Sequence, residues 1–234
     1  MRRVELGLPP LAHTFDQAAR VDRVLVLSSE AFDFPGPPLP PNVGHAGGQL
    51  DDPLWTEPWV SPFDGADERP LVLVRLSSTF QNQLPVLQRI ADAFEPLRAR
   101  GLITTGPALA GQTLSVPGNV HMVPSAPHAQ IIPQSAVVVS HCGHGTALKT
   151  LSAGVPLLCM PMGRDQVDNA ARVVWHGAGL RLKPTASVAE IRCALERMLT
   201  DEHFAESARL LADRLRQDRE RDRAVDEIEA LVQT

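Results

Sequence analysis

The chain has 234 residues, 44% of them hydrophobic, which is enough to bury the core of one domain with a small appendage. Its net charge of -5 argues against nucleic-acid binding through bulk positive charge. No apolar run approaches the ~18 residues of a membrane-spanning helix, and the basic N-terminus lacks the apolar stretch of a signal peptide. Because the three cysteines are odd in number and widely spaced, we expect no disulfide framework and a reducing, cytoplasmic compartment.

Residues 1–69 differ in composition from the rest of the chain. The short apolar run Val24–Leu27 predicts a strand. The Pro/Gly-rich tract at residues 35–53 predicts a loop or linker that has no core of its own. Close to this tract, Trp55 and Trp59 are expected to pack the linker onto a domain, with a ligand platform as the alternative.

A regular alternation of strand and helix patterns begins at residue 70. Short apolar runs predict strands at residues 71–76, 102–105, 120–123, 136–140, 155–161 and 179–183. Helical spacing of apolar residues is found at residues 84–97, from Gly145 onward, and at residues 167–176, 187–199 and 203–232. The alternation predicts an α/β fold with a Rossmann-like parallel sheet and helices on both faces. Ligands on such sheets bind at the carboxyl ends of the strands.

The segment after the strand that ends at Ser140 has the features of an anion site. A glycine-containing turn follows, and a helix is expected to open at Thr146. The first N–H groups of a helix lack intrahelical partners and lie at the positive end of the helix dipole, so they suit a diphosphate. Gly143 and Gly145 let the backbone approach a ligand closely, although tight packing is an alternative explanation for both glycines. His141 and Thr146 are candidates to donate hydrogen bonds to phosphate oxygens.

The full pattern of residues 140–173, SHCGHGTALKTLSAGVPLLCMPMGRDQVDNAARV, resembles the donor-binding signature of family 1 glycosyltransferases. In that family a strand ends in a histidine and glycines, a helix follows, and a Gly-Val-Pro strand leads to an acidic residue followed by glutamine. These parts correspond here to His141-Cys142-Gly143, Gly154-Val155-Pro156, and Asp165-Gln166 with Asn169. Three upstream segments are also similar to the family: RLSSTF (75–80), TTGP (104–107) and APHAQII (126–132).

This resemblance implies the C-terminal, donor-binding domain of a GT-B glycosyltransferase that uses UDP- or dTDP-sugars. It is closest to bacterial members that decorate natural products. The resemblance implies that residues 70–234 form the nucleotide-sugar-binding Rossmann-like domain. Residues 1–69 would then be a short remnant of the N-terminal acceptor domain plus the linker.

The resemblance also assigns roles to individual residues. The diphosphate would be bound by His141, Gly143, His144, Gly145 and Thr146, with Ser77, Ser78 and Thr79 from the end of another strand. The nucleoside would be bound by Ser125, Ala126, His128 and Lys149. Asp165 and Gln166 would hydrogen-bond the hydroxyls of the sugar, because a carboxylate and an amide together accept and donate. A helix N-terminal cap is the alternative for this pair.

Three positions depart from the family pattern. Ser125 stands where the family often has a tryptophan, so stacking of the base by tryptophan is lost at that point. His128 replaces a frequent glutamine, and Lys149 stands where the family has its ribose-binding glutamate. A lysine cannot accept a hydrogen bond from ribose hydroxyls, so strict uridine specificity is not expected, and a dTDP-sugar needs less ribose recognition. The alternative for Lys149 is a solvated helix residue.

The implied reaction is transfer of a sugar from a nucleotide diphosphate to an acceptor hydroxyl of a small molecule. Such transfer needs a general base and electrostatic support for the leaving diphosphate, and we expect this chain to supply only the second, with no catalytic residue of its own. No cofactor or metal is expected, and the spacing of His121, His128, His141, Cys142 and His144 matches no compact zinc pattern.

Two alternatives stay open: a half-enzyme that needs a separate acceptor-binding partner, and a non-catalytic binder or epimerase relative that shares the fold. The last helical region has an apolar face formed by Leu211, Leu215, Val225 and Ile228, which is a candidate interface. Through its exposed interdomain face, the chain is expected to bind a partner subunit or to self-associate.

Overall fold

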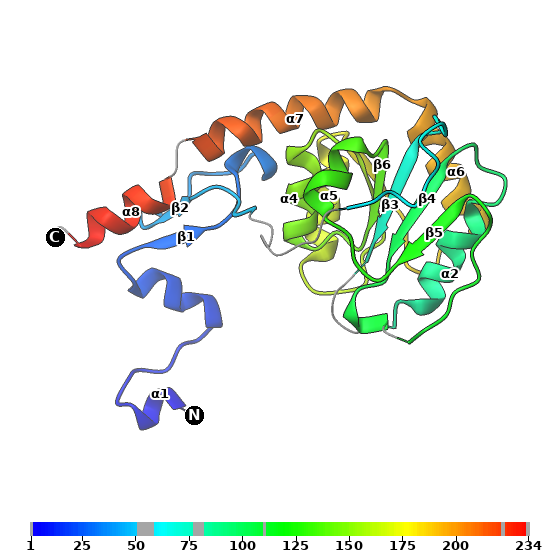
Figure 1. Ribbon diagram of the computed structural model, residues 1–234. Coiled ribbons are helices and arrows are strands. Elements are labelled where there is room, and N and C mark those ends of the chain that lie inside the picture. The colour runs from blue at the N-terminus through cyan, green and yellow to red at the C-terminus, as the bar shows by residue number, and fades with distance from the viewer. Residues whose placement is uncertain (1, 51–58, 77–81, 110, 221–222, 233–234) are drawn as a thin grey trace.

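The computed structural model describes residues 2–50, 59–76, 82–109, 111–220 and 223–232, and at its centre lies a six-stranded parallel sheet (Figure 1). The strand order is β5-β4-β3-β6-β7-β8. The strands are β3 (Leu71–Arg75), β4 (Arg100–Thr104), β5 (Val120–Val123), β6 (Val137–Ser140), β7 (Leu157–Cys159) and β8 (Gly179–Arg181). All neighbouring pairs are parallel, which confirms the predicted α/β fold with a Rossmann-like sheet.

Helices cover both faces of the sheet, as predicted. On one face α2 (Leu84–Ala93) packs against α6 (Val188–Thr200). On the other face α4 (His144–Ser152) contacts α5 (Gln166–Trp175) and α7 (His203–Glu220). The apolar run of β3 explains why helices pack on both faces of the sheet, because successive strand residues point to opposite faces. Val72 and Val74 join the first core cluster, and Leu71 and Leu73 join the second.

The order of the strands places a topological switch point between β3 and β6, where open α/β sheets are expected to leave a crevice. The chain first builds the half of the sheet formed by β3, β4 and β5, and then returns to the other side of β3 to build β6, β7 and β8. The helix after β3 lies on one face of the sheet and the helix after β6 on the other, so the connections diverge at this point. Such a switch point, at the carboxyl ends of the strands, is where open α/β sheets bind ligands.

The N-terminal segment forms a small sheet of its own, which corrects one prediction. Residues 35–53 were expected to be loop or linker throughout, but Val43–His45 form β2, which pairs in parallel with β1 (Val24–Val26). Three residues carry too little pattern to be recognised alone, and the strand exists because β1 supplies its backbone partners. Trp59 packs against the second core cluster, as predicted, whereas Trp55 lies outside the described residues. The domain boundary at residue 69 stays a prediction.

The N-terminal segment also contains two short helices, α1 (Arg2–Glu5) and the 3-10 helix Thr14–Arg20, and a further 3-10 turn, Glu30–Phe32, leads from β1 toward the main domain. Phe32 in this turn is 1% exposed and belongs to the second core cluster. Its neighbour Asp33 accepts a 2.8 Å hydrogen bond from Arg172 on α5. The N-terminal segment is therefore anchored to the main domain through both an aromatic ring and an ion pair.

The C-terminal region divides into α7 and α8 (Arg223–Val232). Leu211 and Leu215 on α7 are buried in the second core cluster, whereas Val225 and Ile228 on α8 are 47% and 54% exposed. The predicted apolar face is therefore divided between two helices: α7 uses its part to pack on α4, and the part on α8 stays a candidate interface. An ion pair between Arg23, which precedes β1, and Glu227 holds α8 beside the small sheet (Figure 1). No helix in the described part of the chain is long and apolar enough to cross a membrane.

Candidate functional site

The turn between β6 and α4 forms one side of the crevice. Ser140 ends the strand, and its hydroxyl accepts a 3.0 Å hydrogen bond from the N–H of Cys142, whose φ of 65° reverses the chain. The helix begins at His144, two residues earlier than predicted. Gly143 occupies the N-cap position, so no side chain caps the first turn of α4. The positive end of this helix therefore faces the crevice with N–H groups suited to an anion.

The two glycines of the turn differ in what their missing side chains permit. A Cβ on Gly143 would stand 2.6 Å from Nε2 of His141, so this glycine lets the imidazole pack against the backbone. A Cβ on Gly145 would meet nothing within 4 Å, and Gly145 is exposed. Packing within the protein therefore explains Gly143 but not Gly145. The surface at Gly145 is open to an incoming ligand.

The histidines of the turn are neutral at physiological pH. Burial lowers the pKa of His141 to about 4, and the positive charge of Arg75 contributes to this shift. Burial also lowers the pKa of the half-buried His144. Asp165 opposes both shifts, so its carboxylate is close enough to act on the two rings. In the ligand-free protein, the two imidazoles therefore offer hydrogen bonds rather than positive charge.

Arg75 is the residue of this site that sequence reasoning missed. It ends β3 and lies opposite Ser140 of β6 in the strand register. Its Nη1 donates a 2.8 Å hydrogen bond to Oγ1 of Thr146, in the first turn of α4. The only signal in the sequence was a basic residue at the end of an otherwise apolar run. The predicted diphosphate ligands Ser77, Ser78 and Thr79, which follow it closely, lie outside the described residues.

The predicted sugar-binding pair stands at the start of α5. Asp165 occupies the cap position, but its side chain does not cap the helix; instead its Oδ2 accepts a 2.7 Å hydrogen bond from Asn169. Gln166 is 2% exposed, and its Oε1 accepts a 2.7 Å hydrogen bond from the N–H of Met162. Asp165 is exposed near the turn, whereas Gln166 is built into the loop before α5. The role of both in binding a sugar stays a prediction.

Three of the four predicted nucleoside residues, Ser125, Ala126 and His128, follow β5, and the fourth, Lys149, is in the last turn of α4. A cleft of about 500 Å³ is found at the carboxyl ends of β4 and β5, with Ser125 on its wall. Its described lining is mostly small or apolar: Thr105, Gly106, Pro107, Gly111, Gln112, Met122, Val123, Pro124 and Ser125. Ala126 is buried, and His128 is half-buried with its Nε2 3.3 Å from Oγ1 of Thr104. Lys149 is half-buried on α4.

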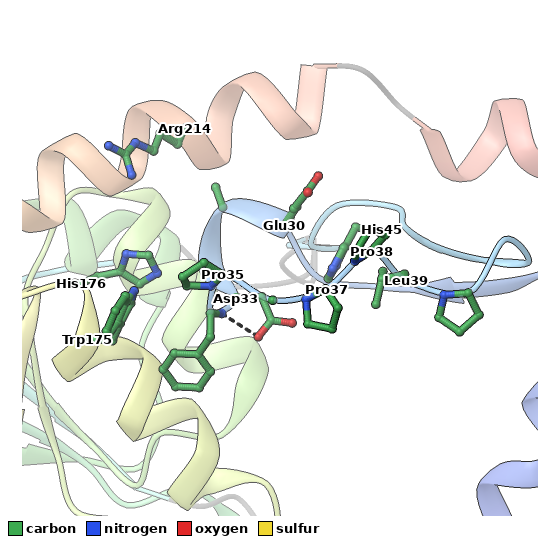
Figure 2. Close-up of a pocket in the computed structure, with 14 residues that line it drawn as sticks. Glu30, Asp33, Pro35, Pro37, Pro38, Leu39, His45, Trp175, His176 and Arg214 are labelled. Atoms are coloured by element: carbon green, nitrogen blue, oxygen red, sulfur yellow. Dashed lines mark hydrogen bonds between the residues drawn. The ribbon is translucent and has the colours of Figure 1, made fainter.

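A larger hollow, of about 1020 Å³, lies elsewhere (Figure 2). It is bounded by Trp175 and His176, at the far end of α5, by Arg214 of α7, and by the proline-rich segment before β2. Because α5 begins beside the glycine turn and ends at this hollow, the two places are separated by the length of the helix. The larger hollow therefore lies at the junction between the N-terminal segment and the main domain, and it is not part of the crevice of the sheet.

Cysteine and histidine side chains form no metal centre in the part of the chain that the structure describes: no three His, Cys, Asp or Glu side chains there come together to hold a metal ion. All three cysteines are free. Cys142 and Cys159 are both fully buried, and their sulfur atoms lie 3.3 Å apart beneath the glycine turn.

Comparison with known proteins gives this geometry a context. Among curated proteins, the chain is 31% identical over 240 residues to 4'-demethylrebeccamycin synthase from Lentzea aerocolonigenes, covering 98% of the chain and 55% of the relative. It is 32% identical to O-mycaminosyltylonolide 6-deoxyallosyltransferase from Streptomyces fradiae, over 70% of the chain and 38% of the relative. The chain therefore spans about half or less of the length of these relatives.

Solved structures agree on the fold. The glycotransferase of kitacinnamycin superimposes with a TM-score of 0.79 at 27% identity, over 98% of this chain and 59% of that one. The glycosyltransferase VinC, solved in complex with dTDP, superimposes with a TM-score of 0.66 at 24% identity, over 90% of this chain and 52% of that one. The chain thus has the fold of the C-terminal half of GT-B glycosyltransferases.

A family match covers the strands and helices that build the crevice, apart from β3. Residues 100–231, more than half of the chain, match the family described as erythromycin biosynthesis protein CIII-like, C-terminal domain. The match includes the glycine turn, the Gly-Val-Pro strand and the start of α5, which are the segments that resemble the donor-binding signature. The chain therefore belongs to this family of glycosyltransferase C-terminal domains.

Proposed function

We propose that this chain binds the donor of a glycosyltransferase, a UDP- or dTDP-sugar, for transfer of the sugar to an acceptor hydroxyl. The observation that carries the proposal is the glycine turn at the switch point of the sheet, with the uncapped start of α4 beside the guanidinium of Arg75. A diphosphate suits this place because it accepts many hydrogen bonds and carries negative charge. No metal or cofactor is part of the proposal.

The nucleobase and the sugar of the donor are assigned to places on either side of the glycine turn. The cleft beside Ser125, at the ends of β4 and β5, is proposed for the nucleobase because its mostly small or apolar lining suits an aromatic ring. Asp165 is proposed to accept hydrogen bonds from the sugar, since it is exposed beside the turn. That VinC was solved with dTDP and belongs to the same fold supports a pyrimidine nucleotide.

The acceptor site is proposed to lie outside this chain. The chain covers 55% of 4'-demethylrebeccamycin synthase, and the small sheet of β1 and β2 is too short to be stable alone. Val225, Ile228 and Leu231 of α8 are 47%, 54% and 48% exposed beside that sheet. We propose that an acceptor-binding half covers these residues, either as another part of a longer chain or as a separate subunit.

Donor binding is tested by calorimetry with UDP and dTDP, using ADP and GDP for comparison. We expect binding of the pyrimidine diphosphates, and His141→Ala should weaken it by about 1–3 kcal/mol, the usual loss for a hydrogen bond to a charged group. His203→Ala, at the start of α7, removes an exposed imidazole and serves as the matched control. Absence of pyrimidine diphosphate binding by the unaltered chain would refute the proposal.

Transfer is tested separately, with UDP- and dTDP-sugars and a panel of hydroxylated acceptors. We expect the chain alone to form no glycoside, because a positioned base contributes a factor of ~10²–10⁴ and a positioned acceptor contributes more. Adding the N-terminal half of the Lentzea relative should restore some transfer if the exposed surface accepts it. Robust transfer by the chain alone would contradict the placement of the acceptor site.

The nucleoside preference is tested with Lys149→Glu. If Lys149 stands at the ribose, the unaltered chain should discriminate poorly between UDP and dTDP, and the variant should favour UDP. A tenfold preference for UDP in the unaltered chain, about 1.4 kcal/mol, would contradict this role of Lys149.

A further inference from the structure

We propose that Arg75 supplies the positive charge that binds the donor diphosphate, and that it aligns the hydroxyl of Thr146 for the same ligand. The inference rests on the proposed function, because it names a ligand-binding residue for that site. It goes beyond the family signature, whose histidine and glycines all lie on the β6 side of the crevice. Arg75 comes from β3, on the other side.

The first argument is position. Arg75 is the last residue of β3, and Ser140, its partner in the register, is the last residue of β6. These two strands flank the switch point of the sheet, where the connections diverge and where open α/β sheets bind their ligands. A side chain that emerges from the end of β3 therefore faces the glycine turn across the crevice, with no intervening strand.

The second argument is the contact with Thr146. Nη1 of Arg75 donates to Oγ1 of Thr146 over 2.8 Å, and Thr146 is only 7% exposed. Because this oxygen accepts from Arg75, the hydroxyl hydrogen of Thr146 is directed toward a different acceptor. A phosphate oxygen at the start of α4 would be such an acceptor. Arg75 thus holds in place a hydroxyl that the sequence analysis predicts as a ligand of the diphosphate.

The third argument is charge. His141 and His144 are neutral near pH 7, so the signature residues of the turn provide hydrogen bonds without a full positive charge. Arg75 keeps its charge at all physiological pH values, and its charge lowers the pKa of His141, which places it within electrostatic range of that ring. Arginine also presents a planar set of N–H donors that matches phosphate oxygens.

A second cation, Arg164, lies before the start of α5 and also lowers the pKa of His141. Arg164 is exposed, whereas Arg75 is half-buried at the end of a central strand. A charge that is partly shielded from water interacts more strongly with a bound anion than a solvated one. Of the two, Arg75 is therefore expected to contribute more to binding.

The experiment measures the affinity of the full chain for dTDP and UDP, and for the corresponding monophosphates, by calorimetry. Arg75→Gln should weaken diphosphate binding roughly 10- to 100-fold, the loss expected for hydrogen bonds to a charged ligand. Monophosphate binding should fall less. Arg75→Lys keeps the charge and should give an intermediate affinity.

Two other arginines serve as controls. Arg164→Gln should weaken diphosphate binding less than Arg75→Gln does. Arg100→Gln, at the opposite end of the sheet, should change the affinity by less than about twofold.

The outcomes separate the inference from the proposed function. If the unaltered chain binds no pyrimidine diphosphate, both fail. If the unaltered chain binds, and both Arg75→Gln and Arg75→Lys bind the diphosphate as tightly as the unaltered chain does, the role of Arg75 is wrong while donor binding stands. An equal or larger loss in Arg164→Gln also overturns the assignment.

Folding of each variant is checked by circular dichroism, and if Arg75→Gln does not fold, Arg75→Lys and Thr146→Val decide the result. Unchanged diphosphate affinity in both of these would refute the inference. A second readout needs no ligand: NMR titration should show a higher pKa for His141 in Arg75→Gln than in the unaltered chain. An unchanged pKa would contradict the proximity on which the argument depends.

Discussion

The side-chain amide of Asn169 joins the two halves of the candidate site. Its Nδ2 donates to the carbonyl oxygen of Cys142 in the glycine turn, over 3.1 Å, and to Oδ2 of Asp165 over 2.7 Å. Asn169 is 5% exposed on α5, so these bonds are shielded from water. One buried amide therefore fixes the carboxylate proposed for the sugar relative to the turn proposed for the diphosphate.

Replacing Asn169 by alanine should weaken both the fold and donor binding. The carbonyl of Cys142 would lose its partner in a buried place, which typically costs about 1–3 kcal/mol of the free energy of unfolding. Urea denaturation measures this loss. Binding of the nucleotide sugar should weaken more than binding of the nucleotide alone, because Asp165 loses its orientation.

Asn119 provides a matched control for this variant. Its amide also holds backbone carbonyls, those of Phe94, Leu97 and Ala99, but it lies at the amino ends of the strands. Asn119→Ala should therefore lower stability and leave nucleotide affinity unchanged. Equal effects of the two substitutions on sugar-nucleotide binding would argue against a special role of Asn169.

The two glycines of the turn should respond differently to alanine. At Gly143 a Cβ would collide with His141, so Gly143→Ala should lower both stability and diphosphate affinity. At Gly145 the space is open and the residue is helical, so Gly145→Ala should leave stability unchanged or raise it by up to about 1 kcal/mol. The same methyl group would occupy the proposed ligand surface and weaken diphosphate binding. A Gly145→Ala variant with full affinity would contradict the position of the ligand.

The sequence predicted the central sheet and the turn well because both carry dense local patterns. The runs that became β3 and β6 are apolar at every position that a doubly covered strand requires, and the turn between β6 and α4 is framed by a strand, glycines and a helix. By contrast, β2 is three residues long inside a proline-rich tract. It depends on a partner strand rather than on its own pattern.

The missed parts of the site arise from contacts between distant segments. Arg75 and Thr146 are far apart in the sequence, and only the parallel pairing of β3 and β6 brings their side chains together. The neighbouring residues Asp165 and Gln166 look equivalent in the sequence, but the loop before α5 buries one and leaves the other exposed. Burial of this kind depends on the path of the loop, which no local pattern specifies.

The three cysteines should differ sharply in reactivity. Cys193 is exposed on α6, whereas Cys142 and Cys159 are fully buried. Burial also raises the pKa of the Cys159 thiol well above its usual value, so it holds little reactive thiolate at neutral pH. A thiol-specific reagent should modify one cysteine rapidly in the native protein and all three in denaturant. Rapid modification of two or three native thiols would show that the core beneath the turn is not packed as described.

The last prediction concerns pH and His141. Its pKa in the folded protein is about 4, below the value of about 6.5 expected when the chain is unfolded. Above pH 6.5 the ring is neutral in both states, and the stability that its burial provides is fully present. As the pH falls from 6.5 toward 4, the unfolded chain binds a proton that the folded chain does not, so the free energy of unfolding decreases.

Urea denaturation between pH 8 and 4.5 should show this decrease, and the decrease should be smaller in His141→Asn, which removes the titrating group. The comparison isolates His141 because His144 and His176, whose pKa values are also lowered by burial, remain in both proteins. Identical pH profiles for the two proteins would show that His141 is not buried as a neutral ring.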